Sequence, residues 1–100
     1  MTQTICHTIN QSPFSSQLWS RCLASVDTND CLVFINDGVY GALNNQPYSH
    51  RLKIKTCYAI DEDIKKRGLD QLALNQEVQL ITYTQWVELS TKHPLSRSWY

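Results

Sequence analysis

The stretch CLVFI at residues 31–35 decides how this chain is expected to fold. Five apolar residues without a polar one between them are typical of a strand that is covered on both faces, as strands of parallel sheets are. Asn36, Asp37 and Gly38 follow directly and end the run. The sequence therefore predicts a buried strand of a parallel sheet, with polar residues at its carboxyl end.

The segment after this strand, residues 39–43, can be read in two ways. The tripeptide Asn36-Asp37-Gly38 on its own favours a hairpin turn. Residues 39–43 show no strand alternation, however, and the Asp37 carboxylate is suited to accept hydrogen bonds from the first N–H groups of a helix. We favour a short helix capped by Asp37, and a hairpin is the alternative.

Strand and helix patterns alternate on both sides of this stretch. Residues 4–9 are rich in β-forming residues. Ser12-Pro13 is a helix-start signal, because serine accepts hydrogen bonds from free N–H groups and proline has no N–H to satisfy. The helix expected at residues 14–26 carries an apolar stripe at three- and four-residue spacing. The further expected elements are a strand at 53–60, a helix at 61–67, a strand at 78–83 and a helix at 84–92 that buries Trp86, Val87 and Leu89.

The order of these elements predicts an α/β fold. In the strand at 53–60, Ile54 and Tyr58 are expected to face one way and Cys57 the other. Strands that alternate with helices form a mainly parallel sheet with helices on both faces. We therefore expect a single three-layer α/β/α domain spanning residues 1–100.

Residues 95–100 are expected to form a tail. Trp99 and Tyr100 lie at its end, and large aromatic side chains are costly to leave in water. They are expected to dock either on this domain or on a neighbouring subunit, which makes both of them possible interface residues.

The composition excludes several classes of protein. Nine basic and nine acidic residues cancel, and no basic stripe suited to phosphate contacts is visible, so direct binding of nucleic acid is not expected. Residues 1–11 lack a basic segment followed by an apolar one, which argues against a signal peptide. No apolar run is long enough to cross a bilayer, so we expect a cytoplasmic protein without membrane contact.

Polar residues near the ends of the predicted strands are the candidates for a ligand site, because chemistry in open parallel sheets gathers there. The possible site-lining residues are His7, Asn10, Ser12 and Asp37. His7 could act as a general base, but a structural hydrogen bond to the neighbouring loop is the interpretation we favour. The chain has only three glycines and no glycine-rich phosphate motif, so no nucleotide cofactor is expected.

The four cysteines, Cys6, Cys22, Cys31 and Cys57, are widely spaced and form no C-x-x-C pair, so no metal site is expected. Cys22 has the strongest claim to a chemical role, since Arg21 is adjacent and a reachable thiolate could carry sulfur. It also falls on the apolar stripe of its helix, where a cysteine is usually an inert hydrophobic residue. The residues alone favour this second interpretation.

Several short segments, taken in order along nearly the whole chain, carry a resemblance to a known family. They are HTIN at 7–10, SPF at 12–14, NDGV at 36–39, AL at 42–43, YAI at 58–60, RGL at 67–69, YT at 83–84, WV at 86–87 and KHP at 92–94, together with Asp63 and Trp99. Each segment is weak alone, but their joint order is specific. The chain resembles the TusB/DsrH family of sulfur-relay proteins.

The resemblance implies a DsrE/F/H-like fold and a heterohexamer with TusC- and TusD-like (DsrF- and DsrE-like) subunits. In the TusBCD form, the complex relays persulfide sulfur to a TusE-like acceptor for 2-thiouridine formation at the tRNA wobble position. In the DsrEFH form, it takes part in sulfur oxidation. The principal sulfur-carrying cysteine belongs to the TusD/DsrE subunit, which implies that this chain is a non-catalytic subunit of a sulfurtransferase complex. Cys22, however, falls where DsrH-type chains carry a cysteine, so the alternative is a DsrH-like subunit in which Cys22 carries a persulfide.

Overall fold

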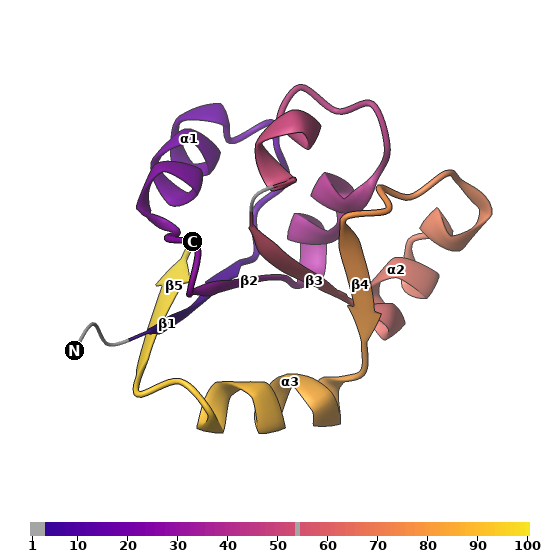
Figure 1. The fold of residues 1–100 in the computed structure, drawn as a ribbon. Helices are drawn as coiled ribbons and strands as arrows, with labels where there is room; N and C mark the ends of the chain where they lie inside the picture. The colour runs from indigo at the N-terminus through magenta and orange to yellow at the C-terminus, as the bar shows by residue number, and fades with distance from the viewer. Residues whose placement is uncertain (1–3, 54) are drawn as a thin grey trace.

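The computed structural model describes residues 4–53 and 55–100, and it is built around one five-stranded sheet (Figure 1). All strand pairs are parallel, and the strand order is β4-β3-β2-β1-β5. The strands are β1 (Ile5–Ile9), β2 (Cys31–Phe34), β3 (Thr56–Ile60), β4 (Val78–Ile81) and β5 (Leu95–Trp99). The predicted α/β fold with a mainly parallel sheet is confirmed.

Helices cover both faces of the sheet, as Figure 1 shows. From β1 to β4 each strand is added on the same side of the preceding one, so right-handed crossovers place the intervening helices on one face. The chain then returns from β4 at one edge to β5 at the other, and α3 crosses the opposite face. The helices are α1 (Ser16–Ser25), α2 (Asp61–Lys66) and α3 (Tyr83–Thr91), and the short 3-10 helices are η1 (Asn36–Ala42), η2 (Ser49–Leu52) and η3 (Leu69–Gln71).

The two faces carry cores of different size. The larger core packs α1, η1, η2 and α2 on the sheet around Trp19 and Phe34, whose stacked rings lie 5.2 Å apart. The smaller core lies under α3, where Trp86 and Leu89 are only partly buried. Val87, which we predicted to be buried, is 60% exposed because α3 turns this side chain away from the sheet. Within the described residues, no helix is both long and apolar enough to span a bilayer.

The segment predicted as a tail is a strand. β5 (Leu95–Trp99) pairs in parallel with β1, and Ile9 is the register partner of Trp99. Four of its five residues are exposed, so the strand lacks the apolar alternation that would reveal it in the sequence. Its place comes from backbone pairing to β1, a contact between the two ends of the chain.

The other predicted elements exist with shifted bounds. The first helix begins at Ser16, not at residue 14, and β3 begins at Thr56, because the chain turns after η2 where the Lys55 amide donates to the Leu52 carbonyl. Tyr58 and Cys57 lie in different cores, as the alternation predicts, whereas Ile54 lies outside the described residues.

A helix rather than a hairpin follows β2, as we favoured, but Asp37 does not cap it. η1 (Asn36–Ala42) has Ile35 at its N-cap position and no side-chain cap. Asp37 lies inside the helix, and its carboxylate accepts a 3.0 Å hydrogen bond from Arg67 Nε instead.

Candidate functional site

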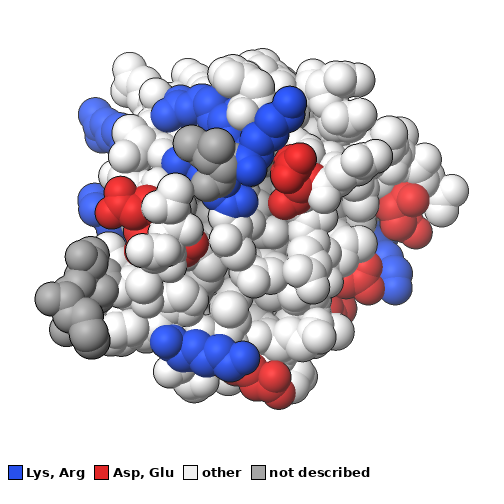
Figure 2. Space-filling model, in the orientation of Figure 1, with Lys and Arg blue, Asp and Glu red and all other residues white. Residues whose placement is uncertain are grey.

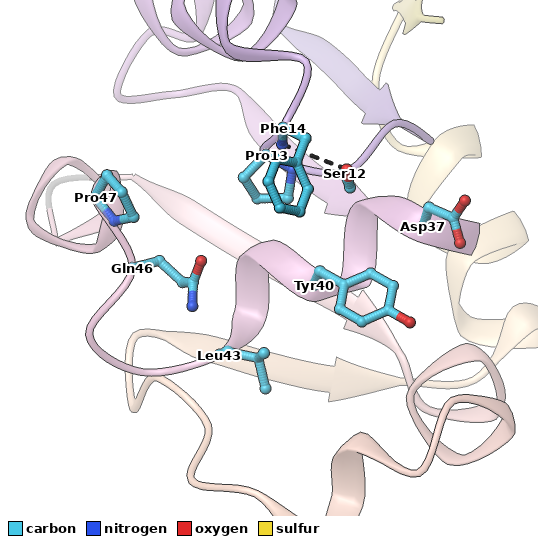
Figure 3. Close-up of a pocket in the computed structure, with 8 residues that line it drawn as sticks. All are labelled: Ser12, Pro13, Phe14, Asp37, Tyr40, Leu43, Gln46 and Pro47. Carbon is cyan, nitrogen blue, oxygen red and sulfur yellow. Dashed lines mark hydrogen bonds between the residues drawn. The ribbon is translucent and has the colours of Figure 1, made fainter.

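A pocket of about 610 Å³ lies beside the carboxyl ends of β1 and β2 (Figure 3). It is formed by the loop between β1 and α1, by η1, and by the segment that follows η1. Its lining residues are Ser12, Pro13, Phe14, Asp37, Tyr40, Leu43, Gln46 and Pro47. Most of these side chains are apolar, and Asp37 is the one charged group among the described residues that line the pocket.

Glycine at position 38 brings one wall of the pocket close to the sheet. A Cβ atom at Gly38 would lie 2.2 Å from the Ile9 carbonyl oxygen, so only glycine allows η1 to approach the end of β1 this closely. The Gly38 amide donates to the Ile35 carbonyl at 2.8 Å, and the Ile35 amide donates to the Ile9 carbonyl at 3.1 Å. These bonds fix the start of η1, the helix that contributes Asp37 and Tyr40 to the pocket lining.

The opposite wall carries an unusually exposed aromatic ring. Phe14 is 99% exposed although it precedes a helix whose own aromatic residue, Trp19, is buried. The loop that holds it is ordered by local bonds: the Phe14 amide donates to Ser12 Oγ at 3.3 Å, and the Ser15 amide donates to the Ser12 carbonyl at 3.0 Å. The Trp19 indole anchors the same loop by donating to the Gln11 carbonyl at 2.7 Å. Phe14 is therefore presented to solvent by a fixed loop.

A buried carboxylate lies behind the pocket. Asp63 is 1% exposed and accepts hydrogen bonds from the Tyr83 hydroxyl at 2.7 and 2.8 Å and from the Asn36 amide at 2.9 Å. Burial of Tyr83 and its hydrogen bond to Asp63 raise the pKa of the Tyr83 hydroxyl to about 12. Arg67 bridges this group to the pocket, since its guanidinium lies 3.8 Å from Asp63 Oδ1 and 3.0 Å from Asp37 Oδ1.

Of the four predicted site-lining residues, the structure brings Ser12 and Asp37 together in the pocket. His7 is fully buried and points into the core, where Nε2 lies 3.1 Å from Asp30 Oδ2 and Nδ1 accepts a hydrogen bond from the Trp99 indole. Because Nδ1 accepts this bond, Nε2 carries the proton that is donated to Asp30. His7 is thus held by the side chains of Asp30 and Trp99, and not by the hydrogen bond to the neighbouring loop that we expected.

Asn10 lies just beyond β1, and its amide donates to the Trp99 carbonyl at 3.3 Å. Its side-chain oxygen is buried and has no hydrogen-bond partner among the described residues. It is not among the residues that line the pocket.

All four cysteines are buried, with exposures of 0 to 3%. Burial raises the pKa of the Cys22 thiol to about 12, and the cations of Lys55 and Arg97 act in the opposite direction without overcoming it. The pKa of Cys57 is also raised to about 12 by burial. Nucleophilic or carrier chemistry requires a sulfur that is accessible and that readily forms a thiolate. In this arrangement Cys22 meets neither condition.

The two aromatic residues at the end of the chain lie in different surroundings. Trp99 is 7% exposed and docks on this chain, with the Arg97 guanidinium 4.2 Å from its ring centre. Tyr100 is 73% exposed, so its side chain is available to a neighbouring subunit. Of the two possible interface residues, the surface therefore presents Tyr100.

The sequence reasoning missed the residues that give the pocket its character. Phe14 was expected on a helix, and its exposure depends on where α1 begins, which the local pattern did not show. The bond between Asp63 and Tyr83 joins residues 20 positions apart. One available signal was that Asp63 follows a predicted strand and Tyr83 is the last residue of another, which is the rule that singled out Asp37.

Comparison with known proteins identifies the family. The model of the family described as DsrH like protein matches residues 11–95. Protein TusB of Pectobacterium parmentieri is 35% identical over 95 residues, covering 93% of this chain and 98% of that protein. Protein TusB of Escherichia coli K12 is 33% identical over 96 residues with the same coverage. The crystal structure of the ychN protein from E. coli superimposes with a TM-score of 0.83 at 17% identity, covering 98% of this chain and 100% of that one, which shows a shared fold. The chain therefore belongs to the TusB/DsrH family.

Proposed function

We propose that this chain is a structural subunit of a TusBCD-like sulfur-transfer complex, which relays persulfide sulfur for 2-thiouridine formation at the tRNA wobble position. Membership of the TusB/DsrH family over nearly the whole chain supports a role in a sulfur relay with partner subunits. The proposed partners are TusC- and TusD-like subunits in a cytoplasmic heterohexamer, and the proposed acceptor is TusE-like.

The burial of every cysteine is the observation that carries the structural part of this proposal. A persulfide is formed and passed on only by a sulfur atom that a donor and an acceptor can both reach. The most exposed of the four, Cys57, is 3% exposed, and Cys22 is 0% exposed. The subunit accordingly serves to complete and shape the assembly, while the sulfur is carried on a partner.

The test is the amount of 2-thiouridine in tRNA from cells that lack the gene, complemented with wild type, Cys22→Ala or Cys57→Ala. The two variants are matched, because both cysteines lie in the same core and burial raises the pKa of both thiols to about 12. We expect deletion to lower thiolation and all three versions to restore it. If deletion left thiolation unchanged, the role in tRNA thiolation would be excluded, and a role in sulfur oxidation would be the remaining hypothesis.

The second candidate function is a DsrH-like subunit in which Cys22 carries a persulfide. The observation in its favour is the influence of Lys55 and Arg97, two cations that lower the pKa of the Cys22 thiol against the effect of burial. Such a role requires α1 to move and expose the sulfur. A complex that assembles normally with Cys22→Ala but loses sulfur transfer, while Cys57→Ala retains it, would establish this role.

A further inference from the structure

Cys6 and Cys31 lie directly opposite each other within the sheet. They are register partners in the parallel pair of β1 and β2, and both belong to the smaller core under α3, so their side chains point to the same face. Neighbouring strands lie about 4.8 Å apart, and the Cα atoms of two cysteines joined by a disulfide lie about 4.4–6.8 Å apart. The two thiols are therefore placed so that a bond between their sulfur atoms can form while the sheet stays folded.

The surroundings of the two sulfur atoms differ. The hydrogen bond from the Cys31 thiol lowers the pKa of Cys6, and Ser90 on α3 acts in the same direction, against the effect of burial. The same hydrogen bond raises the pKa of Cys31, and burial and the Asp30 carboxylate raise it further. Cys6 is therefore the residue of the pair that forms a thiolate more readily, while Cys31 keeps its proton.

The layer that covers this pair is thin. α3 lies over this face of the sheet (Figure 1), and none of its described residues is fully buried. Trp86 and Leu89, which pack on the core that contains the two thiols, are only partly buried. On the opposite face, α1 buries three side chains, and Cys22 is one of them. A segment with few buried apolar contacts opens at a lower free energy than the rest of a fold, so α3 should expose its cysteine pair more readily than α1 exposes Cys22.

The surface over this core favours entry of a small uncharged molecule. Cys6 and Cys31 are 1% and 2% exposed, so a reagent meets them only when α3 moves. In Figure 2, neutral side chains fill the central part of the face shown, between the positions of the sheet and α3 in Figure 1, and the charged side chains lie around it. Moving a charge into such a layer is expensive, whereas a neutral molecule not much larger than water enters at a lower cost. Hydrogen peroxide is an oxidant of this kind.

We propose that Cys6 and Cys31 form a redox site that hydrogen peroxide converts into an intrachain disulfide. The Cys6 thiolate attacks one peroxide oxygen: an S–O bond forms, the O–O bond breaks, and the leaving hydroxide takes up the proton that Cys6 released. The Cys31 sulfur then attacks the resulting sulfenic acid: the S–S bond forms, the S–O bond breaks, and the hydroxyl group leaves as water with the Cys31 proton. Two thiols lose two electrons, and one peroxide becomes two water molecules.

The experiment is treatment of the reduced full chain with hydrogen peroxide, blocking of the remaining thiols with N-ethylmaleimide, and mass spectrometry of the peptides. Digestion with trypsin and with a protease that cleaves before aspartate separates Cys22 from Cys31, because Asp27 and Asp30 lie between them. We expect a crosslink between Cys6 and Cys31 that forms at least about tenfold faster than any bond to Cys22 or Cys57. Dithiothreitol should remove this crosslink and restore both thiols.

Variants separate the roles of the two thiols. In Cys31→Ala, oxidation of Cys6 should stop at the sulfenic acid, which dimedone traps. In Cys6→Ala, Cys31 should be oxidised more slowly than Cys6 in Cys31→Ala, by about tenfold or more. Cys57→Ala is the matched control, since it removes a cysteine of the larger core and should leave the crosslink unchanged. Leu89→Ala removes part of the packing under α3 and should make crosslinking faster by about tenfold.

The wild-type chain decides the outcome, because its test does not depend on the folding of a variant. The redox site would be overturned if no crosslink between Cys6 and Cys31 formed in the folded chain at a peroxide concentration that oxidises the chain in urea. Crosslinking of Cys22 to Cys57 at the same rate would also overturn it, since the whole fold would then be opening. Equal rates in Leu89→Ala and wild type would overturn access through α3.

Discussion

The indole N–H of Trp99 donates a 3.2 Å hydrogen bond to Nδ1 of His7, which joins the last strand of the sheet to the first in the protein interior. The other ring nitrogen of His7, Nε2, lies 3.1 Å from the carboxylate of Asp30, which directly precedes β2. Asp30 in turn accepts hydrogen bonds from the Ile5 amide at 2.8 Å and the Asp27 amide at 3.1 Å. Three polar side chains thus tie together β5, β1 and the loop before β2.

The first prediction concerns this indole. Trp99→Phe keeps an aromatic ring but leaves His7 Nδ1 without its donor in a fully buried position. A buried acceptor without a partner costs about 1–3 kcal/mol, so the free energy of unfolding should fall by that amount in urea denaturation. Tyr100→Phe, a change at a 73% exposed neighbour, should alter it by less than about 0.5 kcal/mol. Equal stability of Trp99→Phe and wild type would contradict a structural role for this bond.

The second prediction concerns the pH dependence of stability. Burial would raise the pKa of Asp30, but the donors Ile5, Asp27 and His7 outweigh it and hold this pKa below its ordinary value. A carboxyl group with a lowered pKa in the folded state stabilises the protein above its unfolded pKa of about 3.9 and loses this contribution as the pH falls through the folded value. We expect wild-type stability to fall below about pH 4, and Asp30→Asn to show a flatter profile in the same window. Parallel profiles of the two proteins would mean that other carboxylates control acid unfolding.

The strands that the sequence predicts are those whose apolar residues follow the burial of the strand in the sheet. The run at residues 31–35 is continuous and apolar because β2 lies in the middle of the sheet and is covered on both faces. β5 lies at an edge, and four of its residues are exposed, so its sequence does not differ from that of a loop. What makes it a strand is pairing with β1, roughly 90 positions away, a contact that no local pattern contains.

The candidate site likewise contains residues that the sequence predicts and residues that it does not. Ser12 and Asp37 were predicted because they follow strands, and the end of a parallel strand is a property of chain order. The exposure of Phe14 depends on the start of α1, and element boundaries are the part of a fold that sequence patterns define least well. The partner of His7 is 23 positions away, so its burial could be suspected from the strand pattern but its bond to Asp30 could not.

The third prediction concerns cysteine reactivity. Because burial raises the pKa of Cys22 and Cys57 to about 12 and leaves both thiols almost inaccessible, they should resist alkylation by iodoacetamide at neutral pH. We expect labelling in the folded protein to be slower by about 100-fold or more than in urea, when it is followed site by site by mass spectrometry. Rapid labelling of Cys22 alone would reveal an opening of α1 and support the persulfide-carrier hypothesis. Rapid labelling of both would indicate that the whole core opens.

The last prediction concerns the packing that supports the pocket. A Cβ atom at Gly41 would lie 1.9 Å from Cη2 of Trp19, so Gly41→Ala must displace an indole that stacks on Phe34 and anchors the Phe14 loop through Gln11. Overpacking of this kind costs about 1–3 kcal/mol of unfolding free energy. The Trp19 indole N–H signal should also move in a ¹H–¹⁵N NMR spectrum, because its bond to the Gln11 carbonyl is disturbed.

Gly68→Ala is the matched control for this change. Gly68 has a φ of 67°, and beyond its chain neighbours no atom of the described residues lies within 4 Å of an added Cβ. Alanine there therefore introduces about 1–2 kcal/mol of backbone strain without touching the core. It should lower stability while the Trp19 signal stays in place. If Gly41→Ala also left that signal in place, η1 would not be packed closely on α1. The Trp19 indole would then not fix the loop that carries Phe14.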